Sequence, residues 1–282
     1  MRLRFLTAAL FIAAPLPAFA QVTADTGVAE EPTIFDGDYA VIGIGAGYLP
    51  SYEGSDDYLI TAAPLLQGSL GGLDFESRGT GLTIDVIPSE GSFNLLLGPA
   101  VRLNLDRTSR IKDPVVRLLG ERDLAIEVGG FAGVAFDGVL NPYDTVTARV
   151  DVLTDVSNEH GGTTITPSFG YSTPLSTAIF AFASVEATYA DDSYTDAFFS
   201  VTPAGTLASG LPNYSANGGW KNVAATVGLN YDLSGDLRDG GLGLFIGGSY
   251  SHLLNDAKDS PIVALRGDRD QWFGAAGLTY AF

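Results

Sequence analysis

The sequence has no cysteine and few of the side chains that catalysis and metal binding most often use. Its 282 residues include two histidines and one methionine. The lack of cysteine excludes disulfide bonds and thiolate metal sites. Lys and Arg number 15 against 33 Asp and Glu, which gives a formal net charge of −18. So acidic a chain is a poor partner for nucleic acid, or for anionic surfaces without bridging cations.

Long apolar runs are also missing. Pro15 interrupts the N-terminal apolar run 6–16 and Pro17 follows it, and the run is too short for the roughly 20 residues of a transmembrane helix. Two arginines precede this run and the small-x-small site Ala18-Phe19-Ala20 follows it, a pattern typical of a secretory signal peptide. We therefore predict that residues 1–20 are a cleaved signal peptide. The polar, acidic segment 21–38 is expected to be a flexible periplasmic lead-in.

The composition of the chain is unusually apolar for an acidic protein. Apolar residues make up 46% of the chain, and glycine contributes 35 residues. A β-barrel with an apolar outside and a polar inside would have this composition. Within lipid, only helices and closed barrels satisfy every backbone group, so a membrane protein without helical spans must be a barrel.

Residues from 39 onward alternate between apolar and polar or small side chains. In 92–105, for example, Phe93, Leu95 and Leu97 fall on one face, with Asn94 and Arg102 on the other. A period of two predicts β-strands. Alternation alone does not separate a barrel from a soluble sandwich, but mid-strand charges are tolerated in a wet barrel lumen and costly on a lipid face.

The chain ends on such a strand, 271–282. Leu278, Tyr280 and the terminal Phe282 share one face. Apolar or aromatic residues at this spacing before a terminal Phe resemble the C-terminal assembly signal of bacterial outer-membrane proteins. We predict that these three residues are recognised by the insertion machinery; the alternative is an ordinary edge strand of a soluble sandwich.

The fold class predicted is all-β: a transmembrane antiparallel β-barrel over 39–282. The predicted twelve strands are 39–48, 58–68, 73–87, 92–105, 124–137, 143–154, 162–174, 178–190, 194–203, 220–232, 242–254 and 271–282. An even number is usual for bacterial single-chain barrels.

This strand count predicts which connections lie outside the cell. The main external loops would be 49–57, 204–219 and 255–270. Strand 73–87 changes face near Gly79-Thr80-Gly81, which predicts a bulge. The basic connection 106–123 would then be periplasmic, as a short amphipathic rim helix, unless the preceding strand count is off by one.

Three stretches resemble a known family. They are GIGAG at 43–47 with PSYEGS at 50–55, YTDAFFSVT at 194–202 with SGLPNY at 209–214, and the segment from Asn255 to Gln271. Together they resemble the family of MltA-interacting protein and OmpV, outer-membrane barrels of Gram-negative bacteria. The resemblance covers the chain from about Asp38 and implies an outer-membrane location. It also implies a scaffolding role between a lytic transglycosylase and a peptidoglycan synthase, although other members are osmolarity-responsive or adhesive. It supplies no catalytic residues.

Charged residues of both signs fall on the predicted lumen faces. The candidates are Arg78, Arg102, Arg149, Asp151, Glu127 and Glu186, with Asp74 and Glu76 beside them. They could form a selectivity constriction, or ion pairs that simply fill a narrow interior. We favour the second interpretation.

Two acidic clusters could in principle hold a hard cation. One is the loop 52–57, and the other combines Asp191, Asp192 and Asp196. The EF-hand arrangement of ligands and glycine is absent, and acidic loops are commonly just solvated. We therefore predict no metal and no cofactor.

Side chains suited to catalysis are also few. His160 and His252 are the only imidazoles, and Ser251 beside His252 points to the opposite face of its strand. The sequence therefore favours a non-enzymatic envelope protein with a structural or scaffolding role; the alternatives are a narrow passive channel for small solutes and, far behind, an outer-membrane enzyme. The partners expected are outer-membrane lipid and lipopolysaccharide, the insertion machinery, and through the family a transglycosylase and a synthase, with no nucleic acid.

The predicted cleavage site can be tested directly. Intact-mass measurement of protein purified from the outer-membrane fraction should find a chain that begins at Gln21. A retained Met1, or recovery of the protein from the soluble periplasm, would contradict the signal peptide and the membrane location together.

Overall fold

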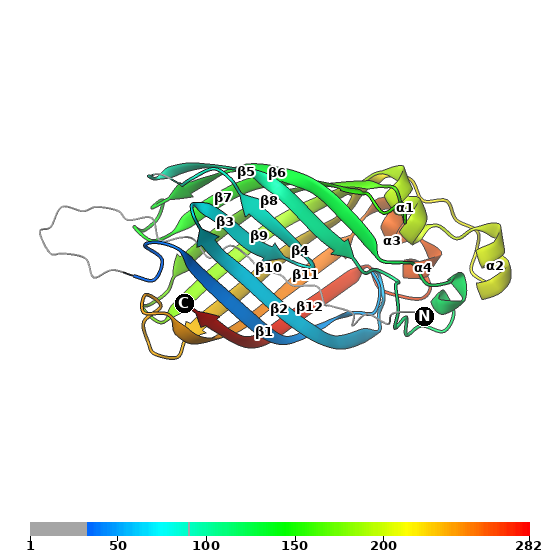
Figure 1. The fold of residues 1–282 in the computed structure, drawn as a ribbon. Helices are drawn as coiled ribbons and strands as arrows, with labels where there is room; N and C mark the ends of the chain where they lie inside the picture. The colour runs from blue at the N-terminus through cyan, green and yellow to red at the C-terminus, as the bar shows by residue number, and fades with distance from the viewer. Residues whose placement is uncertain (1–32, 90) are drawn as a thin grey trace, which may run out of the picture.

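The structure, a computed structural model, describes residues 33–89 and 91–282. In this part of the chain, twelve antiparallel strands form a closed barrel in which each strand pairs with its neighbours in sequence (Figure 1). The strands are β1 (Tyr39–Pro50), β2 (Tyr58–Leu70), β3 (Leu73–Arg78), β4 (Gly81–Asp85), β5 (Phe93–Asn104), β6 (Ala125–Asp137), β7 (Thr145–Asp155), β8 (Thr163–Pro174), β9 (Ile179–Ala190), β10 (Gly219–Asp232), β11 (Gly241–Leu253) and β12 (Asp270–Ala281).

The first and last strands close the ring. β1 pairs with β12 from Val41↔Ala281 to Tyr48↔Gly274. Glycines allow the two strands to approach, because a Cβ at Gly45 would lie 2.3 Å from the backbone oxygen of Ala276. The fold class predicted from the sequence, a twelve-stranded antiparallel barrel, is confirmed.

Alternation along the strands separates an apolar outside from a polar inside. In β5, Phe93, Leu95 and Leu97 are exposed while Asn94 is buried. Aromatic side chains gather near both ends of the outer surface: Tyr48 stacks on Tyr58 toward one end, and Phe93 packs against Phe136 toward the other. An apolar band between two aromatic girdles is the surface that an outer-membrane barrel presents to lipid.

The predicted strand 73–87 is wrong: it is two strands. β3 and β4 form a short hairpin paired from Asp74↔Asp85 to Arg78↔Gly81. The chain therefore reverses at Gly79 and Thr80, where the sequence predicted a bulge. Gly79 has a φ of +61°, which glycine adopts without strain.

The predicted strand 194–203 is also wrong. Its residues form helix α1 (Asp192–Phe199) and the start of α2 (Pro203–Ser209). Asp191 caps α1 by accepting a hydrogen bond from the backbone N–H of Tyr194, and Thr202 caps α2 by accepting one from Gly205. The total of twelve is right because one missed strand and one false strand offset each other.

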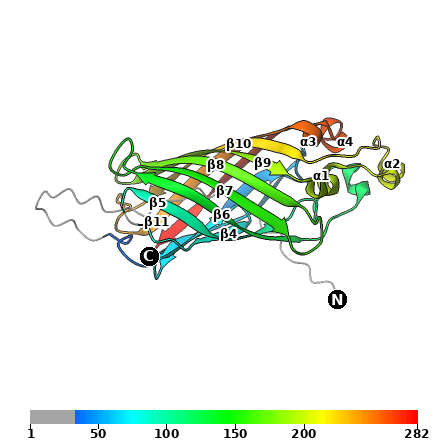
Figure 2. The same cartoon turned by 90° about the horizontal axis from the view of Figure 1, so that it is seen from above.

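The missed strand also corrects the location of the 106–123 connection. It lies at the same end of the barrel as the 51–57, 191–218 and 254–269 segments, and not on the opposite, periplasmic side. Figure 2 shows this end, with α1, α2, α3 (Asn255–Asp259) and α4 (Pro261–Ala264) gathered there, away from the C-terminus. The alternative of a strand count off by one was therefore the correct one. The segment contains a short 3₁₀ helix, η1 (Val116–Leu119).

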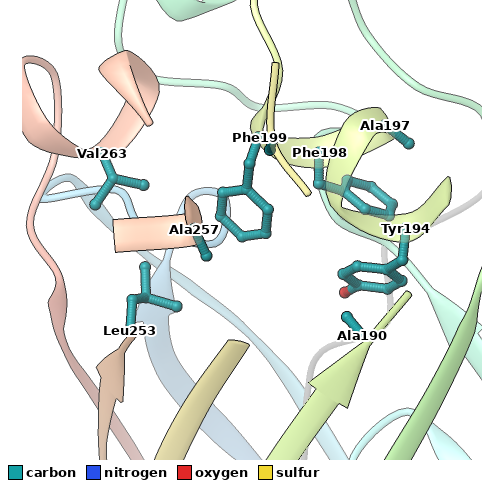
Figure 3. Packing of buried hydrophobic residues seen from close by; sticks show 9 residues of the cluster. Ala190, Tyr194, Ala197, Phe198, Phe199, Leu253, Ala257 and Val263 are labelled. Atoms are coloured by element: carbon teal, nitrogen blue, oxygen red, sulfur yellow. The ribbon is translucent and has the colours of Figure 1, made fainter. Parts of the chain in front are cut away.

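These four connections together form a cap with its own apolar core. Phe199 of α1 faces Ala257, Leu253 and Val263, and Phe198 packs over Tyr194 (Figure 3). A second cluster beside it joins Tyr52, Ile111, Val116, Val201, Leu211 and Ile262. Because each of the four connections contributes a buried side chain, they fold as one unit over the barrel end.

At the opposite end, residues 33–38 contact the rim. The N–H of Ile34 donates to the carbonyl of Arg238, and the ring of Phe35 packs edge-on against Tyr39. This part of the segment predicted to be flexible is thus packed on the barrel. The predicted signal peptide and residues 21–32 lie outside the described residues. Among the described helices, none is long and apolar enough to span a bilayer.

Ring closure has a simple biochemical consequence. A barrel holds its strands by inter-strand hydrogen bonds and resists detergent until it is heated. Unboiled protein should migrate faster than boiled protein on a detergent gel. Equal mobility, for a sample shown by circular dichroism to be folded, would count against the closed ring.

Candidate functional site

The barrel interior contains the six charged residues that the sequence proposed for the lumen. Arg149 and Glu127 are 6% and 1% exposed, and the others are partly buried on inward-facing positions. They divide into a group at mid-height, Arg78, Arg149, Asp151 and Glu186, and an upper group around Arg102 and Glu127.

The mid-height group crosses the lumen. Nη1 of Arg149 on β7 lies 3.0 Å from Oε1 of Glu76 on β3, and its Nη2 lies 2.6 Å from Oδ1 of Asp151. The guanidinium also stacks on Phe131, 3.6 Å from the ring centroid. Arg78 lies 3.6 Å from Glu76. Ion pairs of this kind are costly to bury unless every donor is used, and here they join strands on different sides of the interior.

The upper group is centred on Glu127. Its carboxylate accepts hydrogen bonds from Arg102 Nε at 2.5 Å and from Asn104 Nδ2 at 2.9 Å. His160 Nε2 lies 3.1 Å from Glu127 Oε1, while its Nδ1 accepts the N–H of Gly162. The imidazole therefore fills both of its hydrogen-bonding positions within the fold.

A third cluster, which the sequence did not predict, lies where the cap meets the lumen. Lys221 Nζ is 2.6 Å from Glu53 Oε1 and 4.9 Å from the ring centroid of Tyr194. Strict alternation would place Lys221 outside, next to the inward Asn222. A register shift between Trp220 and Asn222 turns both residues inward, and no residue pattern in the sequence marks that shift.

Asp106 completes this junction and is incompletely bonded. Its Oδ1 accepts the N–H of Glu53 at 2.6 Å, whereas its Oδ2 is buried without a hydrogen-bond partner. Burial, followed by the nearby Glu53 carboxylate, raises the pKa of Asp106 to about 6. At neutral pH the ionised form of Asp106 is therefore disfavoured by its buried surroundings.

Asp113, elsewhere in the cap, shows the opposite behaviour. Burial disfavours its charge, but hydrogen bonds from Arg266 and from the N–H groups of Val115 and Val116 outweigh burial and lower its pKa. Arg266 donates to the same oxygen, Asp113 Oδ2, from both Nε at 3.0 Å and Nη2 at 2.5 Å.

The two acidic clusters that the sequence offered as candidate cation sites, 52–57 and 191–196, instead bond to groups of the cap and barrel. Asp191 caps α1 and also accepts the N–H of Thr163, while Asp192 accepts the N–H of Gly218. Glu53 pairs with Lys221. Among residues 33–89 and 91–282, no group of three or more acidic or histidine side chains could hold a metal ion.

The two histidines do not meet a nucleophile. His160 is paired with Glu127 as described, and His252 Nδ1 lies 2.6 Å from Asp270 Oδ1. Tyr250 donates its hydroxyl to the same carboxylate. Ser251 is buried on the other face of β11, where its hydroxyl accepts from Asn222.

Below the cap, the interior encloses a cavity of about 380 Å³. Its wall combines Ser and Thr hydroxyls, such as Thr61 and Ser249, with the aromatic rings of Phe182, Tyr194 and Phe273. Phe273 thus lies on the lumen side of β12. Leu278, Tyr280 and Phe282, the predicted assembly signal, are exposed on the outer face.

The opposed pKa shifts of Asp106 and Asp113 predict how cap stability depends on pH. Asp106 has a folded pKa above its ordinary value of 3.8, so cap stability should increase as pH falls through the window from about 6 to 4. Asp106→Asn should slow hydrogen exchange of cap amides at pH 7 and remove the increase in cap stability between about pH 6 and 4.

Asp113→Asn is the matched control. Its lowered pKa stabilises the cap above pH 3.8, so its loss should speed exchange at pH 7. Equal effects of both variants would contradict the assignment.

Comparison with solved structures finds other outer-membrane barrels. OprD from Pseudomonas aeruginosa is 12% identical with a TM-score of 0.39, over 96% of this chain and 73% of that one. An outer membrane channel from Pseudomonas putida F1 is 10% identical with a TM-score of 0.46, over 93% and 100%. OmpT of Vibrio cholerae is 11% identical with a TM-score of 0.35, over 87% and 97%. These scores are low, and the fold rests on the strand pairing itself.

Sequence comparison is more specific. No curated protein matches the chain. The model of one family, described as MltA-interacting protein MipA, matches residues 42–282. This match spans all but the first three residues of the barrel and the whole of its cap, including the stretches whose resemblance the sequence had suggested. The chain is an outer-membrane β-barrel protein and belongs to the MltA-interacting protein MipA family.

Proposed function

We propose that the protein is a structural, non-enzymatic component of the outer membrane that binds a lytic transglycosylase at the barrel end opposite the cap. The family's description names an interaction with MltA. The proposal extends that interaction to this chain and assigns it to a particular surface. A link to a peptidoglycan synthase would make the barrel a scaffold between the two enzymes.

The observation that carries this proposal is a rigid apolar turn between β6 and β7. Val139, Leu140 and Tyr143 are 51%, 77% and 63% exposed. Asp144, which is 1% exposed, accepts the backbone N–H groups of Val139, Leu140 and Asn141. A large exposed apolar group on a preorganised backbone favours protein binding.

The charge state of Asp144 supports a fixed turn. Burial opposes its ionisation, but the N–H groups of Leu140 and Val139 and the hydroxyl of Tyr171 outweigh burial and lower its pKa. The carboxylate therefore stays charged at neutral pH and holds the backbone of the turn on both sides of Leu140.

The interior supports a structural role over the channel alternative. The Arg149–Glu76 pair crosses the lumen, and the cap closes one end with a packed apolar core. A solute path through the whole barrel would have to break this pair and pass the cap. The bonding of both histidines within the fold favours a non-enzyme.

The turn can be tested with a matched pair of substitutions. The barrel, in lipid nanodiscs, is titrated with a purified lytic transglycosylase of the MltA type. Leu140→Asp should raise the Kd at least tenfold, about 1.4 kcal/mol, because it places a charge in an apolar contact. Leu207→Asp, which changes the 90% exposed leucine of α2 in the cap, should leave the Kd unchanged.

Two results would contradict the proposal. Equal effects of the two substitutions would remove the turn from the interface. No binding by the unaltered protein, together with stepwise ion conductance in planar bilayers, would support the channel instead.

A further inference from the structure

The β2–β3 seam leaves a long stretch of strand without a neighbour at the cap end of the described barrel. β2 pairs with β1 along its whole length, from Pro50↔Tyr58 to Tyr39↔Ser69. On its other side it pairs with β3 only from Gln67↔Glu76 to Leu70↔Leu73. Residues 58–65 therefore form an unpaired edge, roughly 25 Å long at about 3.3 Å per residue.

The short β3–β4 hairpin causes this edge. β4 reaches high on β5, where Gly81 pairs with Arg102 near the end of the strand. β3 then reverses at Gly79 and Thr80, several residues before β2 ends. The hairpin pairs in register with only residues 100–102 of β5 and 67–70 of β2. The part of β2 nearest the cap is therefore left without a ladder partner.

The unpaired edge lies at membrane depth. Tyr58, at its cap end, stacks on Tyr48 in the outer aromatic girdle. Ile60, the next outward residue toward the middle of the barrel, is 70% exposed, and Leu66 further along is 37% exposed. Lipid therefore faces the outer side of the seam.

The backbone groups of this edge are only partly satisfied. The N–H of Leu66 donates to Ser77 Oγ, so the even-numbered residues of β2 direct their backbone groups to the seam. Lys112 and Arg110 donate to the carbonyls of Tyr58 and Ile60. Pro64 has no N–H to satisfy, as expected at a strand edge. No hydrogen bond from any other described residue reaches the seam-facing backbone groups of Ala62.

The interior cavity extends to the same seam. Its wall includes Leu59 and Thr61 of β2, Gly79 and Thr80 of the hairpin tip, and Ser109 and Arg110 of the 105–124 connection. These residues are the three borders of the unpaired stretch. An open sheet edge at membrane depth is tolerated only where it is covered by protein or borders a water-filled cavity, and this edge borders the cavity.

We propose that the seam is a lateral window through which the cavity takes a small uncharged amphiphile from the outer leaflet. The size and wall of the cavity define this class of ligand. At about 380 Å³ it falls within the range of small-molecule pockets. Phe182 and Phe273 suit an apolar body, while the hydroxyls of Thr61, Thr226 and Ser249 suit one hydroxyl or similar group.

The charges of the cavity wall argue for an uncharged ligand. Arg102 is paired with Glu127 and Lys221 with Glu53. Asp151 is paired with Arg149, and Arg78 with Glu76. An anionic ligand that bound Arg78, Arg102 or Lys221 would have to break one of these pairs, whereas a neutral one leaves all of them in place.

The absence of cysteine makes the window directly testable. Thr61→Cys places a thiol on the cavity side of the seam, and Ser249→Cys places one on the closed wall, where β11 pairs with both β10 and β12. The two positions are 8% and 7% exposed and line the same cavity. Each variant of the whole barrel, shown by gel mobility to be folded, is placed in phosphatidylcholine liposomes.

Two maleimides then distinguish the route of entry. N-phenylmaleimide, which partitions into the bilayer, should label Thr61→Cys at least tenfold faster than a sulfonated maleimide of similar size. It should also label Thr61→Cys faster than Ser249→Cys, which lies further from the window. Faster reaction with the sulfonated reagent would show entry through the cap, and no reaction with either would show a sealed seam. Both results overturn the window.

A second arm tests the ligand class, with 2-naphthol as the amphiphile and naphthalene-2-sulfonate as its charged counterpart. 2-Naphthol should slow labelling of both cysteines at least threefold, and the sulfonate should not. No protection, or equal protection by both, overturns the proposed class.

Ala62→Cys gives the last control. A disulfide-linked dimer formed through this residue would show that a second copy of the protein covers the edge, and would overturn the window.

Discussion

The satisfaction of backbone hydrogen bonds in lipid is the constraint on which the rest of this structure depends. Water is absent from the bilayer core, so each strand must find its partners in its neighbours. Most adjacent pairs in the described ring are held by ladders that run along nearly the whole length of their strands, and the ring closes through β1 and β12. The exceptions are β2 with β3 and β4 with β5, because the two strands of the intervening hairpin are only 6 and 5 residues long.

Closing the ring creates a second problem, which is how to fill its interior. Glycines and small hydroxyl residues on the inner faces leave space, and paired charges occupy part of it. The Arg149 guanidinium uses Glu76, Asp151 and the face of Phe131 at once. Removal of Arg149 would leave the Asp151 carboxylate without its ion-pair partner, and breaking a buried pair typically costs about 3–5 kcal/mol. The cap uses apolar packing instead: Phe198, Phe199, Ile262 and Val263 are nearly or fully buried, each contributing about 1.5–3 kcal/mol.

Much of the barrel could be predicted from the sequence because a lipid-facing surface imposes a strict period of two. The strand predictions that were wrong lie where contact with lipid does not decide the structure. In 73–87 the change of face at the turn of a short hairpin resembled a bulge. In 194–203 the apolar residues pack into the cap, and the decisive signal was local: Asp191 and Thr202 are helix caps. The inward charges follow from alternation, but Lys221 does not, since one register shift reverses its direction. Contacts such as Glu53 with Lys221 join residues 168 positions apart and leave no trace in local patterns.

The same constraint explains why an acidic chain keeps a basic segment between β5 and β6. Most of its Arg and Lys side chains donate hydrogen bonds to backbone carbonyls and not to carboxylates. Arg107 donates to the carbonyls of Phe198 and Gly120, and Arg122 donates to the carbonyl of Ala197. Arg110 and Lys112 reach the carbonyls at the upper end of the unpaired β2 edge. Long donors from one loop thus replace part of the ladder that the short hairpin cannot supply. Their reach ends at Ile60, so the lower part of the edge is left to the cavity, and the length of the hairpin sets both the need for the basic loop and the size of the opening beneath it.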